Sequence, residues 1–84
     1  MAEDFVITFS PYVANTMAQL TTVATVALLD GEVLWQEPVI VDVRQNMLVA
    51  DVELALAGLT SGFGARVNAI LLARSLQGTM PKIR

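Results

Sequence analysis

Two pairs of carboxylates have a spacing that could support chemistry: Asp30 with Glu32, and Asp51 with Glu53. Carboxylates held close together can exchange protons with a substrate or supply oxygen ligands to a calcium ion. The two-residue spacing is also that of neighbouring side chains on the solvent face of a strand. Because no further oxygen ligands follow at the spacing of a calcium loop, we expect solvated carboxylates, with no metal site and no catalytic residue.

A glycine cluster, Gly58-x-x-x-Gly62-x-Gly64, could bring the backbone close to a phosphate group. It lacks the Gly-Lys-Ser/Thr ending of a phosphate-binding loop and the spacing of a dinucleotide-binding turn. We therefore expect a tight corner between two elements and no cofactor.

The chain has no histidine and no cysteine. Ser10, Ser61 and Ser75 are available as nucleophiles, but no histidine can act as their base, and Lys82 is the only lysine. The sequence therefore predicts a protein that is not an enzyme. No motif points to a known family.

Partner-binding residues are easier to nominate, because aromatic residues and arginine are enriched at the centres of protein interfaces. Trp35 lies beside a polar residue and close to Pro38, and Phe63 lies in the glycine-rich corner. Burial in the core of the chain is the alternative for both. The predicted interface residues are Phe5, Tyr12, Trp35, Phe63, Arg66 and Arg74.

With 84 residues, of which 55% are hydrophobic and 15% charged, the chain is small and apolar, with a mean hydropathy of +0.61. A single domain of this size buries only about 60–65% of the surface of its unfolded chain. The apolar excess should therefore emerge as exposed patches, which commonly mark interfaces. An apolar core with a thin polar coat is the alternative.

Charge is distributed unevenly: residues 1–43 contain six acidic side chains and no basic one, and residues 54–84 contain four basic and no acidic ones. The net charge of −3 argues against nucleic-acid binding, which needs a basic surface. The two halves could attract each other between copies and drive self-association, or pair within one fold.

Residues 5–29 contain no charged residue and are long enough to cross a membrane. Polar residues are spread through them, so the sequence argues against a membrane span. Glu3 and Asp4 lie where a secretory signal needs positive charge, so we expect no signal peptide and a location in the cytoplasm or a virion.

Alternating apolar residues predict a first strand at 5–9, or an arm of residues 1–10 that joins a neighbour's sheet. Ser10 and Pro11 can open a short helix near 11–19, with a loop as the alternative, before a strand at 21–29. Asp30-Gly31 predicts a type I′ hairpin turn into a second strand, which Pro38 should confine to a sheet edge or bend.

The last third is ambiguous. Residues 48–59 alternate as a strand, which we favour, because a helix would leave Leu54 on its far side. Residues 65–76 suit a helix or a last strand equally well, and 77–84 form a basic tail.

Together these patterns predict one domain over 1–84 that is mainly β: an antiparallel sheet or sandwich of four to five strands, with possible helices near 11–19 and 65–76, or α+β as the alternative. The expected function is a structural or interaction subunit, above all a viral particle accessory protein such as a capsid decoration or tail subunit. The alternatives are an accessory subunit of a membrane-bound or multi-subunit enzyme complex and a monomeric ligand-binding β module.

Overall fold

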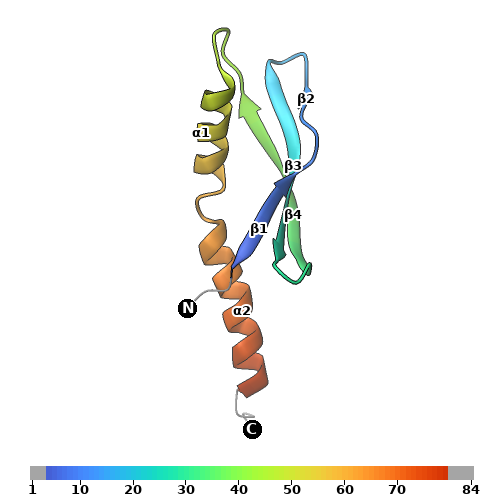
Figure 1. Cartoon of the computed structure of the whole chain (residues 1–84), viewed down its shortest axis with the longest axis vertical. Helices are drawn as coiled ribbons and strands as arrows, with labels where there is room; N and C mark the ends of the chain where they lie inside the picture. Colours follow the sequence, from blue (N-terminus) through green and yellow to red (C-terminus); the bar gives the residue numbers. More distant parts are fainter. Residues whose placement is uncertain (1–3, 80–84) are drawn as a thin grey trace.

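The computed structural model describes residues 4–79, and the other residues at the two ends lie outside it. Four strands are followed by two helices (Figure 1). The elements are β1 (Phe5–Phe9), β2 (Val13–Ala14), β3 (Gln19–Leu28), β4 (Val33–Asp42), α1 (Val49–Leu59) and α2 (Phe63–Thr79). The strand content of 36% nearly equals the helix content of 35%, so the predicted antiparallel fold is confirmed, with α+β the better description.

The sheet is built around β3, the longest uncharged strand. On one edge β3 pairs antiparallel with β4, from Gln19↔Asp42 to Ala27↔Val33. β1 and β2 therefore share the other edge and form one interrupted strand, with Phe5 opposite Leu28 and Val13 opposite Thr21. The predicted first strand is confirmed and belongs to the chain's own sheet.

The short helix that the sequence allowed near 11–19 does not form, and the alternative, a loop, is present there, interrupted by β2. Ser10 does not cap a helix: its Oγ accepts the N–H of Val23 at 2.8 Å, and the hydroxyl of buried Thr22 donates to the Ser10 carbonyl at 2.6 Å. Asn15 Oδ1 then accepts the N–H groups of Met17 and Gln19 and stabilises the turn into β3. These side-chain bonds compete with a helix for the same backbone donors.

The hairpin from β3 to β4 is confirmed, but its predicted turn type was wrong. A type I′ turn needs positive φ at two residues, and of Leu29–Glu32 only Gly31 has one, at 98°. The Gly31 N–H donates to the Leu28 carbonyl at 2.9 Å, and Leu28 donates to Glu32 at 2.8 Å. This is a type I turn followed by a glycine bulge, the usual three-residue hairpin loop. Pro38 lies in the edge strand β4, as predicted.

Residues 49–59 form helix α1, so the favoured strand at 48–59 was wrong. The segment is rich in alanine and leucine, which favour helices, and Asp51 accepts the N–H of Leu48 at the helix start at 2.9 Å. Alternation of apolar residues is weak evidence for a strand where the same residues also recur at the spacing of one helix face. Val52 and Leu56 face the sheet, whereas Leu54 points away and is 72% exposed.

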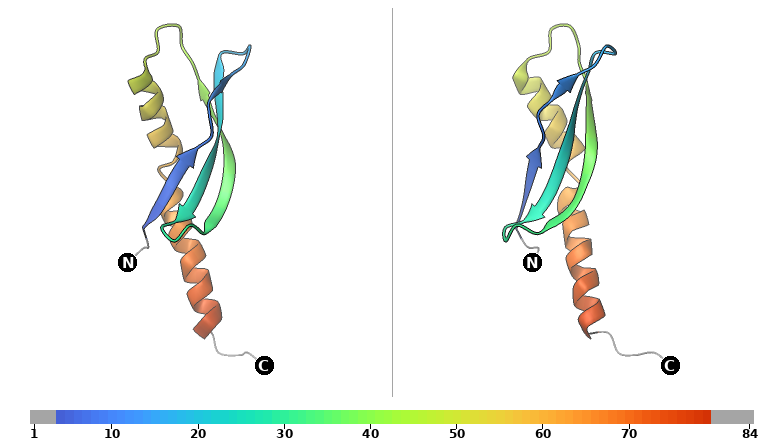
Figure 2. Two further views of the ribbon diagram at one scale, coloured as in Figure 1. Left: turned by 45° about the vertical axis from the view of Figure 1, so that its right-hand side comes forward. Right: turned by 90° about the vertical axis from the view of Figure 1, so that its right-hand side faces the viewer.

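Residues 65–76, for which the sequence favoured a helix and a last strand equally, lie in helix α2, which begins at Phe63 and extends to Thr79. Both helices lie on the same face of the sheet, and α2 continues past the β3–β4 hairpin (Figure 2). Val26 and Val67 are fully buried between the layers, with Ala24, Val39, Val41, Leu56 and Phe63 around them.

The molecule is elongated. It measures 59 × 24 × 20 Å, and its radius of gyration of 16.8 Å exceeds the roughly 12 Å of a compact chain of this length. Of the predicted arm and tail, Phe5–Phe9 form β1 and residues 77–79 belong to α2, whereas 1–3 and 80–84 lie outside the described residues. Because the molecule is long and narrow, much of the surface of its two helices is not covered by other elements of the described chain.

Candidate interaction surfaces

Three of the predicted interface residues meet where β4 crosses the start of α2. The rings of Trp35 and Phe63 pack edge to face, with centroids 5.4 Å apart. The guanidinium of Arg66 lies 4.4 Å from the Trp35 ring centroid and 5.1 Å from that of Phe63. Trp35 and Arg66 both bind Glu37 Oε1, at 2.9 Å and 2.7 Å.

This aromatic clamp, Trp35, Glu37, Phe63 and Arg66, holds the carboxylate in its charged form. The hydrogen bond from Trp35, together with Arg66, lowers the pKa of Glu37 below its ordinary value of 4.5. A carboxylate that is ionised and satisfied at neutral pH is a poor general acid or base. The clamp therefore fastens the start of α2 to the sheet through an ionised carboxylate.

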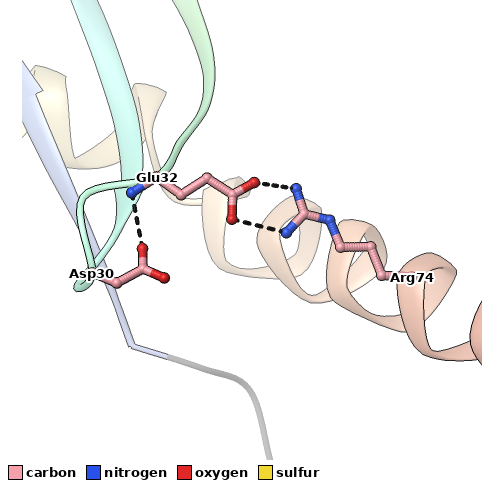
Figure 3. A network of polar contacts seen from close by, with 3 residues as sticks. All are labelled: Asp30, Glu32 and Arg74. Atoms are coloured by element: carbon pink, nitrogen blue, oxygen red, sulfur yellow. Dashed lines mark hydrogen bonds and ion pairs between the residues drawn. The ribbon is translucent and has the colours of Figure 1, made fainter.

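A second ion pair joins the far part of α2 to the hairpin (Figure 3). Arg74 forms a two-pronged contact with Glu32, at 3.1 Å and 2.5 Å, and Asp30 accepts the N–H of Glu32 at 2.9 Å. The hydrogen bond to Glu32 raises the pKa of Arg74. Acidic residues of the first half and arginines of α2 thus form ion pairs within one chain. This is the alternative to attraction between copies that the charge distribution allowed.

The remaining predicted interface residues lie along the strand edge. Phe5 packs against the core, near Gly64 at the start of α2. Tyr12 stacks on Phe9 with ring centroids 6.3 Å apart and keeps 44% of its surface exposed. Phe63 is only 3% exposed, so its ring is covered by its own chain. A role of these residues in binding a partner stays a prediction.

Asp30, Asp51 and the glycine cluster have structural roles in the fold. Asp30 stabilises the hairpin loop and Asp51 the start of α1. The hydroxyls of Thr60 and Ser61 donate to carbonyls at the end of α1, each at 2.9 Å, so the glycine cluster forms the corner between the helices. Within residues 4–79 no three acidic side chains are placed to hold a metal ion.

One surface was missed by the sequence reasoning: the side of both helices, and of the corner between them, that faces away from the sheet. We call it the helix outer face. All of its members are exposed, none is charged, and they are Ala50, Leu54, Ala57, Ser61, Ala65, Ala69, Leu72 and Leu76. The leucines are 72%, 53% and 57% exposed in that order. The signal was present as the misfit of Leu54 in the helical interpretation.

A second apolar surface is the open side of the sheet, the sheet outer face. An antiparallel sheet commonly turns polar residues to solvent. Here β-branched residues dominate between the strand ends, and the members with large exposed apolar side chains are Val6, Val13, Val23, Val33 and Ile40. Gln36 donates to Thr25 in the middle of this face at 2.9 Å.

A groove separates α1 from the interrupted edge strand. Two adjoining cavities of about 400 and 380 Å³ share Tyr12, Glu53 and Leu56 in their walls. Further lining residues are apolar apart from Thr60: Ile7, Phe9, Leu20, Val49, Val52 and Ala57. The groove is open along its length because a single helix is too narrow to cover the sheet.

The stretch Val49–Gln77 is long and apolar enough to cross a membrane by length and composition. Only 17% of its most apolar part is buried inside the molecule. Residues 5–29, the uncharged stretch noted in the sequence, form β1, β2 and β3 and the segments between them.

Comparisons with protein-family models, with curated proteins and with solved structures found no match to this chain. The surfaces of the molecule are therefore the guide to its function.

Proposed function

We propose that this protein is a non-enzymatic structural subunit that acts by self-association and by contact with a larger protein assembly. The observation that carries the proposal is the helix outer face, where eight neighbouring positions are exposed and uncharged. Contiguous apolar surface of this kind on a soluble protein commonly marks an interface, because water contact is unfavourable for it. The sheet outer face supplies a second contact surface on the opposite side.

Two apolar faces on opposite sides suit a subunit of a repeating assembly. Small proteins that decorate or cement larger particles use their surfaces for contact and need no catalytic group. A viral particle accessory protein, such as a capsid decoration or tail subunit, is therefore the candidate we favour. Its place would be the virion, or the cytoplasm in which the virion is built.

The test is the solution mass of the 84-residue chain, measured by size exclusion with light scattering at two salt concentrations. We expect a defined oligomer larger than the 9.0 kDa monomer. Leu54→Glu should shift the chain to the monomer, because it buries a charge in the contact. Leu48→Glu is the matched control, since Leu48 is similarly exposed at 69% and lies outside the helix outer face. A native chain that is monomeric at all concentrations would overturn self-association.

An accessory subunit of a membrane-bound complex is a second candidate, supported by the length and composition of Val49–Gln77. Insertion would have to pull α2 off the sheet, expose buried Phe63 and Val67, and break the contact between Arg66 and Glu37. We therefore rank it below the assembly subunit. Carbonate extraction of membranes from expressing cells distinguishes the two, because an inserted chain remains in the pellet.

A monomeric ligand-binding module is favoured only by the groove beside α1. Its volume suits a small apolar ligand, since such sites are concave and mostly apolar. Saturable binding of a small apolar dye, with no change in mass and with loss of binding in Leu56→Gln, would move this candidate ahead.

A further inference from the structure

We propose that the occupant of the helix outer face is a second copy of this chain, docked antiparallel, so that α1 of each copy lies against α2 of the other. The inference rests on the proposed self-association and adds its partner, orientation and contact pairs. The two-fold axis would pass near position 63, between the helices.

The first support is the spacing of the helix outer face. Its positions follow one another in steps of four, three and four residues over 50–61, and again over 65–76. This is the alternation with which helices pair along a narrow seam. The two halves are also symmetric about position 63, so the pattern read backwards equals the pattern read forwards.

A two-fold axis turns this symmetry into contacts, because a residue then faces the one at equal distance on the other side of the axis. Leu54 would meet Leu72 of the other copy, and Ala57 would meet Ala69. Near the axis, a Cβ atom built on Gly58 or Gly62 meets nothing within 4 Å, so a neighbouring backbone can approach closely there. Large side chains thus meet at the ends and small ones at the centre.

The second support is charge. The charged residues of α1 are Asp51 and Glu53, and those of α2 are Arg66 and Arg74. An antiparallel pair places each helix beside the helix of opposite net charge, whereas a parallel pair places the acidic flanks of two α1 helices together. Because Arg66 and Arg74 already pair with Glu37 and Glu32 of their own chain, the main electrostatic difference is repulsion between the acidic α1 residues of two copies, which disfavours the parallel pair.

The third support is the shape. The last turns of α2 extend past the β3–β4 hairpin (Figure 1). Arg74 contacts the hairpin on one side of these turns, whereas Leu72 and Leu76 on the outer side are 53% and 57% exposed. An antiparallel copy would cover these turns with the start of its own α1. The same copy would leave the clamp at Glu37 and Arg66 intact, which a membrane-inserted α2 would not.

Cysteine cross-linking tests the orientation directly, because the native chain has no cysteine. A disulfide forms only where two Cα atoms approach to about 4.4–6.8 Å. We expect a mixture of Leu54→Cys and Leu72→Cys chains to give mainly the mixed disulfide dimer on mild oxidation. Each variant alone should give several-fold less. Ala57→Cys with Ala69→Cys is a second pair that changes smaller side chains, should the leucine variants fail to fold.

The outcomes separate this inference from the proposed function. Self-cross-linking of Leu54→Cys alone, as strong as that of the mixture, would mean a parallel pair and would overturn the inference. A second outcome is that the variants keep the native oligomer mass, neither mixture cross-links, and Val23→Cys on the sheet outer face does cross-link. This result would overturn the antiparallel inference and leave self-association standing. A monomeric native chain, or one retained in membranes, would overturn both.

Discussion

One carboxylate oxygen of Glu37 binds the indole N–H of Trp35 at 2.9 Å and, at 2.7 Å, the guanidinium of Arg66. Trp35 and Glu37 are two residues apart on β4 and therefore share its helix-facing side. Arg66 also lies over the Trp35 ring, so the two residues of β4 hold the start of α2 from two directions. The ionised form of Glu37 thus adds to the attachment of the helical layer, beside the buried core and the ion pair of Arg74 with Glu32.

Acid should therefore weaken the fold. The pKa of Glu37 is lower in the folded chain than its ordinary value of 4.5, so the folded state favours the ionised form. Its stabilising effect is present above the unfolded pKa and is lost as the pH falls through the folded pKa. We expect the melting temperature of the native chain to fall between pH 5 and 3, and Glu37→Gln to melt lower at pH 7 and to vary less with pH.

Asp42→Asn is the control for this measurement. Asp42 accepts a hydrogen bond from Gln19 at 3.0 Å and belongs to no ion pair in the described chain, and asparagine can still accept that bond. It should keep both the stability and the pH dependence of the native chain. A Glu37→Gln variant with an unchanged acid transition would show that another group controls it.

Phe63 should be required for the fold itself. Its ring is 3% exposed and packs against Trp35, so Phe63→Ala removes a large buried side chain and leaves a cavity. We expect a loss of about 3–5 kcal/mol in the free energy of unfolding, measured by urea denaturation. Leu72→Ala removes a side chain of similar size that is 53% exposed, and should cost about 1 kcal/mol or less in the isolated chain. Equal losses would mean that Phe63 is not a core residue.

Ala18 is a place where the chain can be stabilised. It is the non-glycine residue with positive φ in the described chain, at 57°, where the Cβ atom is strained. Ala18→Gly should raise the free energy of unfolding by about 0.5–1 kcal/mol, because relief of strain exceeds the added entropy of the unfolded chain. The reverse change, Gly31→Ala at φ 98°, should lower it by about 1 kcal/mol. A loss of stability in Ala18→Gly would contradict the argument.

The sequence was sufficient where local signals and tertiary structure agree. The alternating Phe5–Phe9 gave a strand, Asp30-Gly31 a hairpin, and Pro38 an edge position, all as predicted. It was insufficient where one local signal serves two structures. Ser10 followed by Pro11 can cap a helix. In the folded chain the Ser10 hydroxyl instead accepts the N–H of Val23, which belongs to β3, a strand that lies later in the chain. A local pattern does not reveal this partner.

The error over residues 48–59 explains why the candidate surface was missed. The strand interpretation was preferred because Leu54 would be unburied in a helix, on the assumption that a large apolar side chain must lie inside. In the folded chain Leu54 is unburied. A sequence can show which positions share a helix face, but not that the face is left for a second molecule.

The orientation of that second molecule can also be tested by charge at one position. In the antiparallel pair, exposed Ala73 would lie on the same flank as Asp51 of the other copy. Ala73→Lys should therefore tighten the dimer and Ala73→Glu should loosen it, each by about 1.4- to fivefold in Kd for each contact, as expected for an exposed ion pair of about 0.2–1 kcal/mol. Sedimentation equilibrium at low salt measures both constants, and the difference should shrink at 0.5 M salt because the charges are screened. If the two variants have the same Kd, Asp51 does not lie across from position 73, and the antiparallel dimer is contradicted.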